Sequence, residues 1–140
     1  MTETPIKCID FKQYARFVDA VTSDASKDFI AFSDRVVNLD EKGANIERLL
    51  TGSVGINSEG GEIMEIVKKL LFQGKDWSPE TIYHLKRELG DVMWYVTQCL
   101  VALDSSMEEV IDMNIEKLKA RYPGGEFDAY YSENREEGDL

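Results

Sequence analysis

Apolar residues recur at every third or fourth position along most of the chain, the spacing that places side chains on one face of an α-helix. The pattern predicts two short helices, or one kinked helix, between Asp10 and Val37. Three longer helices are expected at residues 46–72, 79–103 and 105–121. No segment alternates apolar and polar residues in the manner of a strand. The sequence therefore predicts an all-α fold, an antiparallel bundle of four to five helices.

The turn at residues 73–77 sets the direction of the two central helices. Ser78 is suited to cap the second of them, and Pro79 fits its first turn. A turn of about five residues makes the helices that it joins antiparallel. Gly52 and Gly55 loosen the pattern at the start of the first central helix, whose apolar stripe continues to Phe72.

The last helix has a clear start and a clear end. Ser105 and Glu108 have the spacing of a capping box, and the run Tyr122-Pro123-Gly124-Gly125 stops the helix after Arg121. Residues 126–140 are acidic and polar and are expected to form a tail that orders only against a neighbouring element or subunit. We therefore expect one domain over residues 1–125, followed by this tail.

Two acidic pairs lie in the central helices, Glu59 with Glu62 and Glu88 with Asp91. Each pair borders the apolar stripe of its helix, so packing through these stripes brings four carboxylates together. Like charges that close oppose folding unless a cation lies between them. Mg²⁺, with Mn²⁺ as a second possibility, prefers such oxygen ligands and is often completed by substrate phosphates. A single ExxE pair is more often a solvated helix surface, but two pairs in register predict a metal site.

Gly60 and Gly61 lie inside the first acidic helix, next to its carboxylates. Each glycine costs a helix about 1 kcal/mol relative to alanine, so a compensating close approach is expected. Either a ligand or another backbone comes near, or two helices pack through these small residues.

Asn114, Lys117 and Arg121 share one flank of the last helix. An amide and two cations on one face suit a triphosphate, because arginine and lysine bind phosphate oxygens. In the alternative interpretation, Lys117 and Arg121 only stabilise the carboxyl end of the helix through its dipole. Both interpretations stay open at this point.

Composition narrows the classes of partner. The 140 residues suit one domain, and the net charge of −11 argues against general binding to nucleic-acid polymers or anionic membranes. A small polyphosphate remains compatible if metal ions neutralise the site. The two cysteines form no CxxC motif, which favours a reducing compartment. No apolar leader or membrane-spanning run appears, so we expect a cytoplasmic protein.

Three segments in this order carry a family resemblance: EGGEIMEIVKK at residues 59–69, ELGDVMWY at 88–95 and NIEKLKARYP at 114–123. Together, over about residues 50–125, they resemble the MazG-like all-α nucleoside triphosphate pyrophosphohydrolases. Dimeric dUTPases and phosphoribosyl-ATP pyrophosphatase are related branches. The resemblance implies hydrolysis of a nucleoside triphosphate to the monophosphate and pyrophosphate. It further implies the following roles: Mg²⁺ ligands Glu59, Glu62, Glu88 and Asp91, and sugar or phosphate contacts Asn114, Lys117 and Arg121.

The chemistry expected of such a site needs a base and a place for the nucleobase. Glu59 or Glu62 would accept the proton of the attacking water. Ser58 stands where several relatives carry a further glutamate, so the sequence leaves the choice of base open. The side chains considered for the nucleobase are Trp77, His84, Trp94 and Tyr95.

Tyr95 is the preferred contact to the base, since it lies one turn after Asp91. Aromatic residues at helical spacing are, however, more often part of a core. His84 lies four residues before Glu88 on the same flank and either contacts the nucleotide or has a partner on the protein surface.

A small helical domain with a cleft and surplus aromatic residues is expected to form a homo-oligomer. The resemblance points to a dimer, or a tetramer built as a dimer of dimers, in which the last helix or N-terminal segment of one subunit reaches the site of another. The main alternative is a helical adaptor without catalysis, whose acids face solvent. A di-iron carboxylate bundle is disfavoured, because it would use ExxH pairs and the sequence has none.

Overall fold

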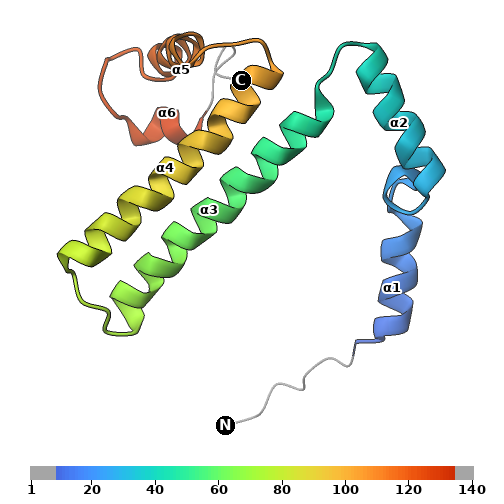
Figure 1. Cartoon of the computed structure of the whole chain (residues 1–140), viewed down its shortest axis with the longest axis horizontal. Coiled ribbons are helices and arrows are strands. Elements are labelled where there is room, and N and C mark those ends of the chain that lie inside the picture. The colour runs from blue at the N-terminus through green and yellow to red at the C-terminus, as the bar shows by residue number, and fades with distance from the viewer. Residues whose placement is uncertain (1–8, 135–140) are drawn as a thin grey trace. The chain divides into compact units, whose positions relative to one another are not determined.

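A computed structural model describes residues 9–134 and shows a helical chain (Figure 1). The elements are α1 (Phe11–Ala20), the 3-10 turn η1 (Asp24–Ser26), α2 (Phe29–Glu41), α3 (Ile46–Phe72), α4 (Pro79–Ala102), α5 (Met107–Arg121) and α6 (Ala129–Glu133). Residues 9–134 contain no strand, which confirms the all-α prediction. None of the helices in this range has the length and apolar character needed to span a membrane. Pro5, Cys8 and residues 135–140 lie outside the described range.

Three boundaries differ from those expected. α2 continues to Glu41, four residues beyond the end expected at Val37. The cap of α5 is Ser106, whose hydroxyl accepts a hydrogen bond from the Glu109 amide, while the neighbouring Ser105 hydroxyl donates to the Glu109 carboxylate at 2.6 Å. Part of the predicted tail is ordered as α6, which Asp128 caps.

Two compact units make up the chain, Met1–Gly43 and Ala44–Leu140. In the first unit α2 packs against η1, and none of the described residues is buried. The first helix starts near Asp10, as expected, and Asp10 caps it by accepting hydrogen bonds from two amides of the first turn. The apolar side chains of this helix are not covered by other residues. Phe11, Tyr14 and Phe17 in α1 are exposed, and so is Val21 at its carboxyl end.

The second unit is built on an antiparallel pair of long helices, α3 and α4, which lie side by side (Figure 1). The predicted cap of α4 is confirmed, since the Thr81 amide donates to the Ser78 hydroxyl at 3.2 Å. The buried Thr81 hydroxyl in turn donates to the Asp76 carbonyl at 3.0 Å, which ties the connecting segment to α4. This connection holds the two helices antiparallel.

Two glycines let α3 and α4 approach closely. A β-carbon at Gly55 would overlap the ring of Tyr95, and one at Gly52 would overlap the sulfur of Cys99. Nothing lies within 4 Å of a β-carbon built at Gly60 or Gly61. Packing of helices through Gly60 and Gly61 is therefore wrong for the described chain, and the close approach occurs one to two turns earlier.

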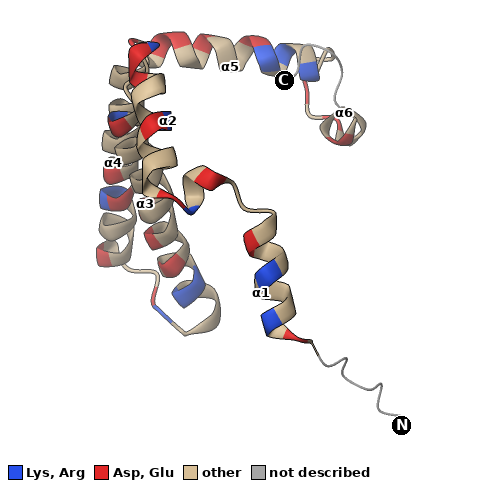
Figure 2. Cartoon of the chain, turned by 90° about the vertical axis from the view of Figure 1, so that its right-hand side faces the viewer, with Lys and Arg blue, Asp and Glu red and all other residues tan. Residues whose placement is uncertain are grey.

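α5 follows α4 through a turn in which Asp104 adopts a positive φ of 51°. Figure 2 shows α5 crossing the end of the α3–α4 pair and extending away from it. Residues 111–120 of α5 are all exposed, so this helix buries little against its own chain. After α5 the chain turns back, and the Phe127 ring lies 5.8 Å from that of Tyr122.

Replacing Gly55 with alanine tests the close approach of α3 and α4. The added methyl group must displace the Tyr95 ring, and overpacking of this kind costs about 1–3 kcal/mol. We expect Gly55→Ala to lower the free energy of unfolding measured with urea. The matched control is Gly60→Ala, which meets open space and should raise stability by up to about 1 kcal/mol through helix propensity. Equal effects of the two substitutions would contradict the predicted role of Gly55.

Candidate metal centre

Three carboxylates meet halfway along the α3–α4 pair. Glu59 projects from α3, and Glu88 and Asp91 project from α4, with one oxygen of each within 4.8 Å of the others. The contact between Gly55 and Tyr95 lies one turn away on each helix, so it fixes the register in which the acids face each other. Glu88 is buried at 6% exposure, Glu59 is half-buried and Asp91 is exposed. The group is thus anchored in the helix interface and open to solvent on one side.

The electrostatics of the cluster favour a bound cation. Burial raises the pKa of the Glu59 carboxyl above its ordinary value of 4.5, and the charges of Glu62, Asp91 and Glu88 raise this pKa further. A hydrogen bond between Glu59 and Glu88 acts in the same direction. Three anionic oxygens so close together are unfavourable unless a proton or a metal ion lies among them. An all-oxygen, acidic group of this kind fits a hard divalent cation.

Glu62 stands slightly apart from this group. It is exposed and does not share the 4.8 Å separation of the other three acids, although its charge acts on Glu59. The structure therefore brings together three of the four acids named from the sequence and places the fourth beside them.

Glu65, one turn further along α3, belongs to a different kind of group. It forms ion pairs with Lys68 and with Lys69, the latter at 3.4 Å, and these two cations lower the pKa of its carboxyl. Half-exposed charge pairs of this type on a helix surface contribute little to stability. Glu65 is thus an ordinary surface glutamate, which makes it a useful comparison for the acids of the cluster.

His84 contacts the cluster through its buried member. The Nε2 atom of His84 lies 3.1 Å from Oε1 of Glu88, one helical turn further on. From the sequence, His84 either contacts the nucleotide or has a partner on the protein surface. The contact with Glu88 matches the second interpretation. Its bearing on the nucleotide stays a prediction.

The aromatic candidates for a base contact lie in two places. Tyr95 packs over Gly55 between the two helices and meets Trp94 edge to face, with ring centroids 4.9 Å apart. Trp77 is exposed in the connection before α4. Since α4 begins at Pro79, nine residues before Glu88, this connection lies about 14 Å from the cluster along the helix axis.

The polar and basic residues of α5 are not brought to the acids of their own chain. Asn114, Lys117 and Arg121 lie on a helix that begins beyond the end of α4, about 16 Å along the axis from Asp91. From there α5 runs away from the pair (Figure 2). These three residues therefore do not meet the carboxylates within the described part of a single chain, and their contact with a substrate stays a prediction.

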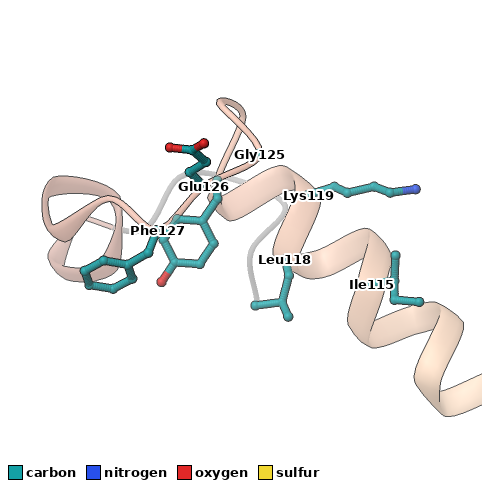
Figure 3. A pocket seen from close by; sticks show the side chains of 7 residues that line it. Ile115, Leu118, Lys119, Gly125, Glu126 and Phe127 are labelled. Carbon is teal, nitrogen blue, oxygen red and sulfur yellow. The ribbon is translucent and has the colours of Figure 1, made fainter.

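A separate hollow of about 330 Å³ lies where the chain turns back after α5 (Figure 3). Its walls are mainly apolar and include Ile115, Leu118, Tyr122 and Phe127, with Lys119 and Glu126 as its charged members. Among the described residues, the group of Glu59, Glu88 and Asp91 is the one with metal-binding geometry, and none of its members borders this hollow.

Comparison with known proteins identifies the family of the chain. The model of the MazG nucleotide pyrophosphohydrolase domain matches residues 50–125, more than half of the chain, and includes all four predicted acids. The Gene 37 protein of Mycobacterium phage L5 is 41% identical over 83 residues, covering 58% of this chain and 72% of that protein. No solved structure matches significantly. The chain belongs to the MazG nucleotide pyrophosphohydrolase family.

Proposed function

We propose that the protein is a Mg²⁺-dependent nucleoside triphosphate pyrophosphohydrolase, cleaving a ribo- or deoxyribonucleoside triphosphate to the monophosphate and pyrophosphate. The observation that carries the proposal is the convergence of Glu59, Glu88 and Asp91 from two helices of a MazG domain. Family membership supports a pyrophosphohydrolase reaction, and the acids supply the chemistry that such a reaction needs. The dUTPase and phosphoribosyl-ATP pyrophosphatase branches are the alternative substrate classes.

Glu59, Glu88 and Asp91 would hold the metal ion, with Mn²⁺ as an alternative to Mg²⁺. Their donors are all carboxylate oxygens, which suit hard cations and disfavour metals that prefer nitrogen or sulfur. The exposed side of the group, at Asp91, leaves room for water and phosphate oxygens. When bound, the ion polarises the phosphoryl oxygens and lowers the pKa of a coordinated water.

Glu62 is the acid best placed to act as the general base. It neighbours the three grouped carboxylates without being one of them, so its oxygens remain available to water. In the hydrolysis it accepts the proton of the attacking water, whose oxygen forms the new bond to phosphorus as pyrophosphate leaves. Glu59 is the alternative base, but one of its oxygens belongs to the group that would hold the cation.

A helical adaptor without catalysis is a poorer match to the same residues. An adaptor would carry its acids on a solvated surface, as Glu65 is carried with its two lysines. Glu88 is instead buried beside two other acids, an arrangement that destabilises the folded chain when no cation is present.

The active protein is proposed to be a homo-oligomer, because α3 has two apolar sides. Gly55 and Ile66 face α4, whereas at about 100° per residue Leu50 and Met64 lie roughly opposite them and Val54 lies about 100–120° away from them. These three side chains are 58%, 61% and 66% exposed. An apolar stripe of this length on a family domain indicates a protein interface, and a second copy of the chain is the proposed partner.

The proposed homo-oligomer also gives a role to the polar and basic residues of α5. Asn114, Lys117 and Arg121 lie far from the acids of their own chain but on a helix that extends outward. We assign them to the phosphates or sugar bound at the acids of a partner, in a dimer or a tetramer built from two dimers.

Removing one ligand tests the catalytic proposal. We expect Asp91→Asn to lower Mg²⁺-dependent pyrophosphate release by at least the roughly 100-fold that even the loss of an outer-shell partner can cost. Helicity, followed by circular dichroism, should be unchanged because Asp91 is exposed. Glu65→Gln is the control and should retain full activity. Substrates for the assay are the common and the oxidised or methylated nucleoside triphosphates; a wild-type protein inactive on all of them would favour the adaptor.

The raised pKa of Glu59 predicts how pH acts on the metal-free protein. A carboxyl whose folded-state pKa lies above 4.5 stabilises the fold fully below that pH, and this contribution is lost as the pH rises through the raised pKa. We therefore expect the melting temperature of the wild type to fall below that of Glu59→Gln as the pH approaches neutrality. Saturating Mg²⁺ should reverse the order. A difference that does not vary with pH would contradict the interpretation.

Mixing two inactive variants tests the shared site. Glu88→Gln removes an acid from one chain, and Arg121→Ala removes a cation from the other. If a site combines α3 and α4 of one subunit with α5 of its partner, a mixed dimer regains one intact site of two. Unfolding the variants together and refolding them should then restore about a quarter of wild-type activity for random pairing in a two-fold dimer. No recovery, or a monomeric wild type by light scattering, would contradict the assembly.

A further inference from the structure

His84 lies against the one deeply buried acid of the cluster. Its Nε2 atom is 3.1 Å from Oε1 of Glu88, and the spacing of four residues on α4 places the two side chains on the same face. The Glu88 side chain is 8% exposed, whereas that of His84 is 52% exposed. The imidazole therefore reaches inward from the surface to a carboxylate that is otherwise enclosed by the helix pair.

This contact gives the two carboxylate oxygens of Glu88 different roles. Because Nε2 of His84 lies against Oε1, Oε2 remains as the ligand for a cation. A glutamate side chain has several rotatable bonds, and a hydrogen bond to one oxygen limits the directions in which the other can point. Partners of this kind around a metal ligand typically change metal affinity 10- to 100-fold.

The other two acids of the group are held differently. Asp91 is exposed and has a short side chain, so its backbone position largely determines where its carboxylate lies. Glu59 is half-buried on α3, the opposite helix, and forms a hydrogen bond with Glu88. Glu88 thus contacts both His84 and Glu59, so a fixed orientation of the Glu88 carboxylate also orients Glu59.

We propose that His84 is a positioning residue, which holds Oε1 of Glu88 through the 3.1 Å contact with its Nε2 atom and thereby directs Oε2 toward the bound divalent cation. The proposal rests on the proposed function, since it assumes that Glu88 ligates a metal. It assigns to His84 a role in metal affinity, whereas contact with the nucleotide would act on substrate affinity.

The test is a titration of the metal-free protein with Mn²⁺, followed by electron paramagnetic resonance. His84→Ala should raise the Mn²⁺ dissociation constant about 10- to 100-fold. His84→Gln should restore most of the affinity, because its amide N–H₂ can donate to the same oxygen. The matched control is Tyr83→Ala, which removes an exposed ring from the adjacent position and should bind Mn²⁺ as the wild type does. Circular dichroism confirms that the helices remain.

Kinetics provide the second measurement. In His84→Ala the Mg²⁺ concentration for half-maximal pyrophosphate release should rise by the same factor, while kcat at saturating Mg²⁺ stays near that of the wild type. Wild-type affinity in His84→Ala, or failure of His84→Gln to restore affinity, would overturn the role of His84 and leave the proposed function intact. No Mn²⁺ binding by the wild type would instead overturn the proposed function, and the role of His84 with it.

Discussion

The close contact between α3 and α4 at Gly55 is the constraint on which the site depends. Because no side chain separates the helices there, Tyr95 lies directly over the backbone of α3. One turn further along each helix, Glu59 and Asp91 face each other across the same narrow interface. A bulkier residue at Gly55 would move the helices apart, and oxygens that now lie within 4.8 Å would separate with them. The packing of the two helices at Gly55 therefore also determines the geometry of the metal site.

The closeness of the three acids lowers the stability of the metal-free fold and at the same time favours metal binding. Burying Glu88 beside Glu59 and Asp91 places like charges in a poorly solvated position. Burial first, and then repulsion by the neighbouring acids, raises the pKa of Glu59. The same repulsion is the driving force for binding a divalent cation, since the ion relieves it. The helix pair tolerates the strain because the capped connection at Ser78 and Thr81 keeps the helices paired.

Periodicity and capping chemistry were sufficient to predict most of the fold. Ser78 and Pro79 marked the start of α4 correctly, and the short turn before them predicted the antiparallel pair. The acids could be named from their position beside the apolar stripes. What the sequence could not give was which of two acids three residues apart points inward, because both Glu59 and Glu62 border the stripe. That choice depends on the exact rotation of α3 about its axis, which the contact at Gly55 fixes.

Other features escaped sequence analysis for related reasons. From the sequence, Gly52 and Gly55 predict only a weakened helix, because a glycine by itself does not reveal the side chain that packs over it. The contact of His84, by contrast, is consistent with one of the two alternatives that the sequence offers, because a spacing of four residues places His84 and Glu88 on one face of α4. The direction of α5 depends on the turn at Asp104, whose positive φ is uncommon for a residue other than glycine.

The contrast between the two sides of α3 links the site to assembly. On one side Gly55 and Ile66 lie against α4, and on the other Leu50 and Met64 remain exposed. A helix that presents apolar residues on opposite sides is stable in water only when both are covered, since each exposed side chain forfeits its share of the hydrophobic stabilisation. The single chain covers one side, the side that builds the metal centre. A partner that covered the other would hold α3 in the orientation that points Glu59 at α4, so that assembly and metal binding would stabilise the same arrangement.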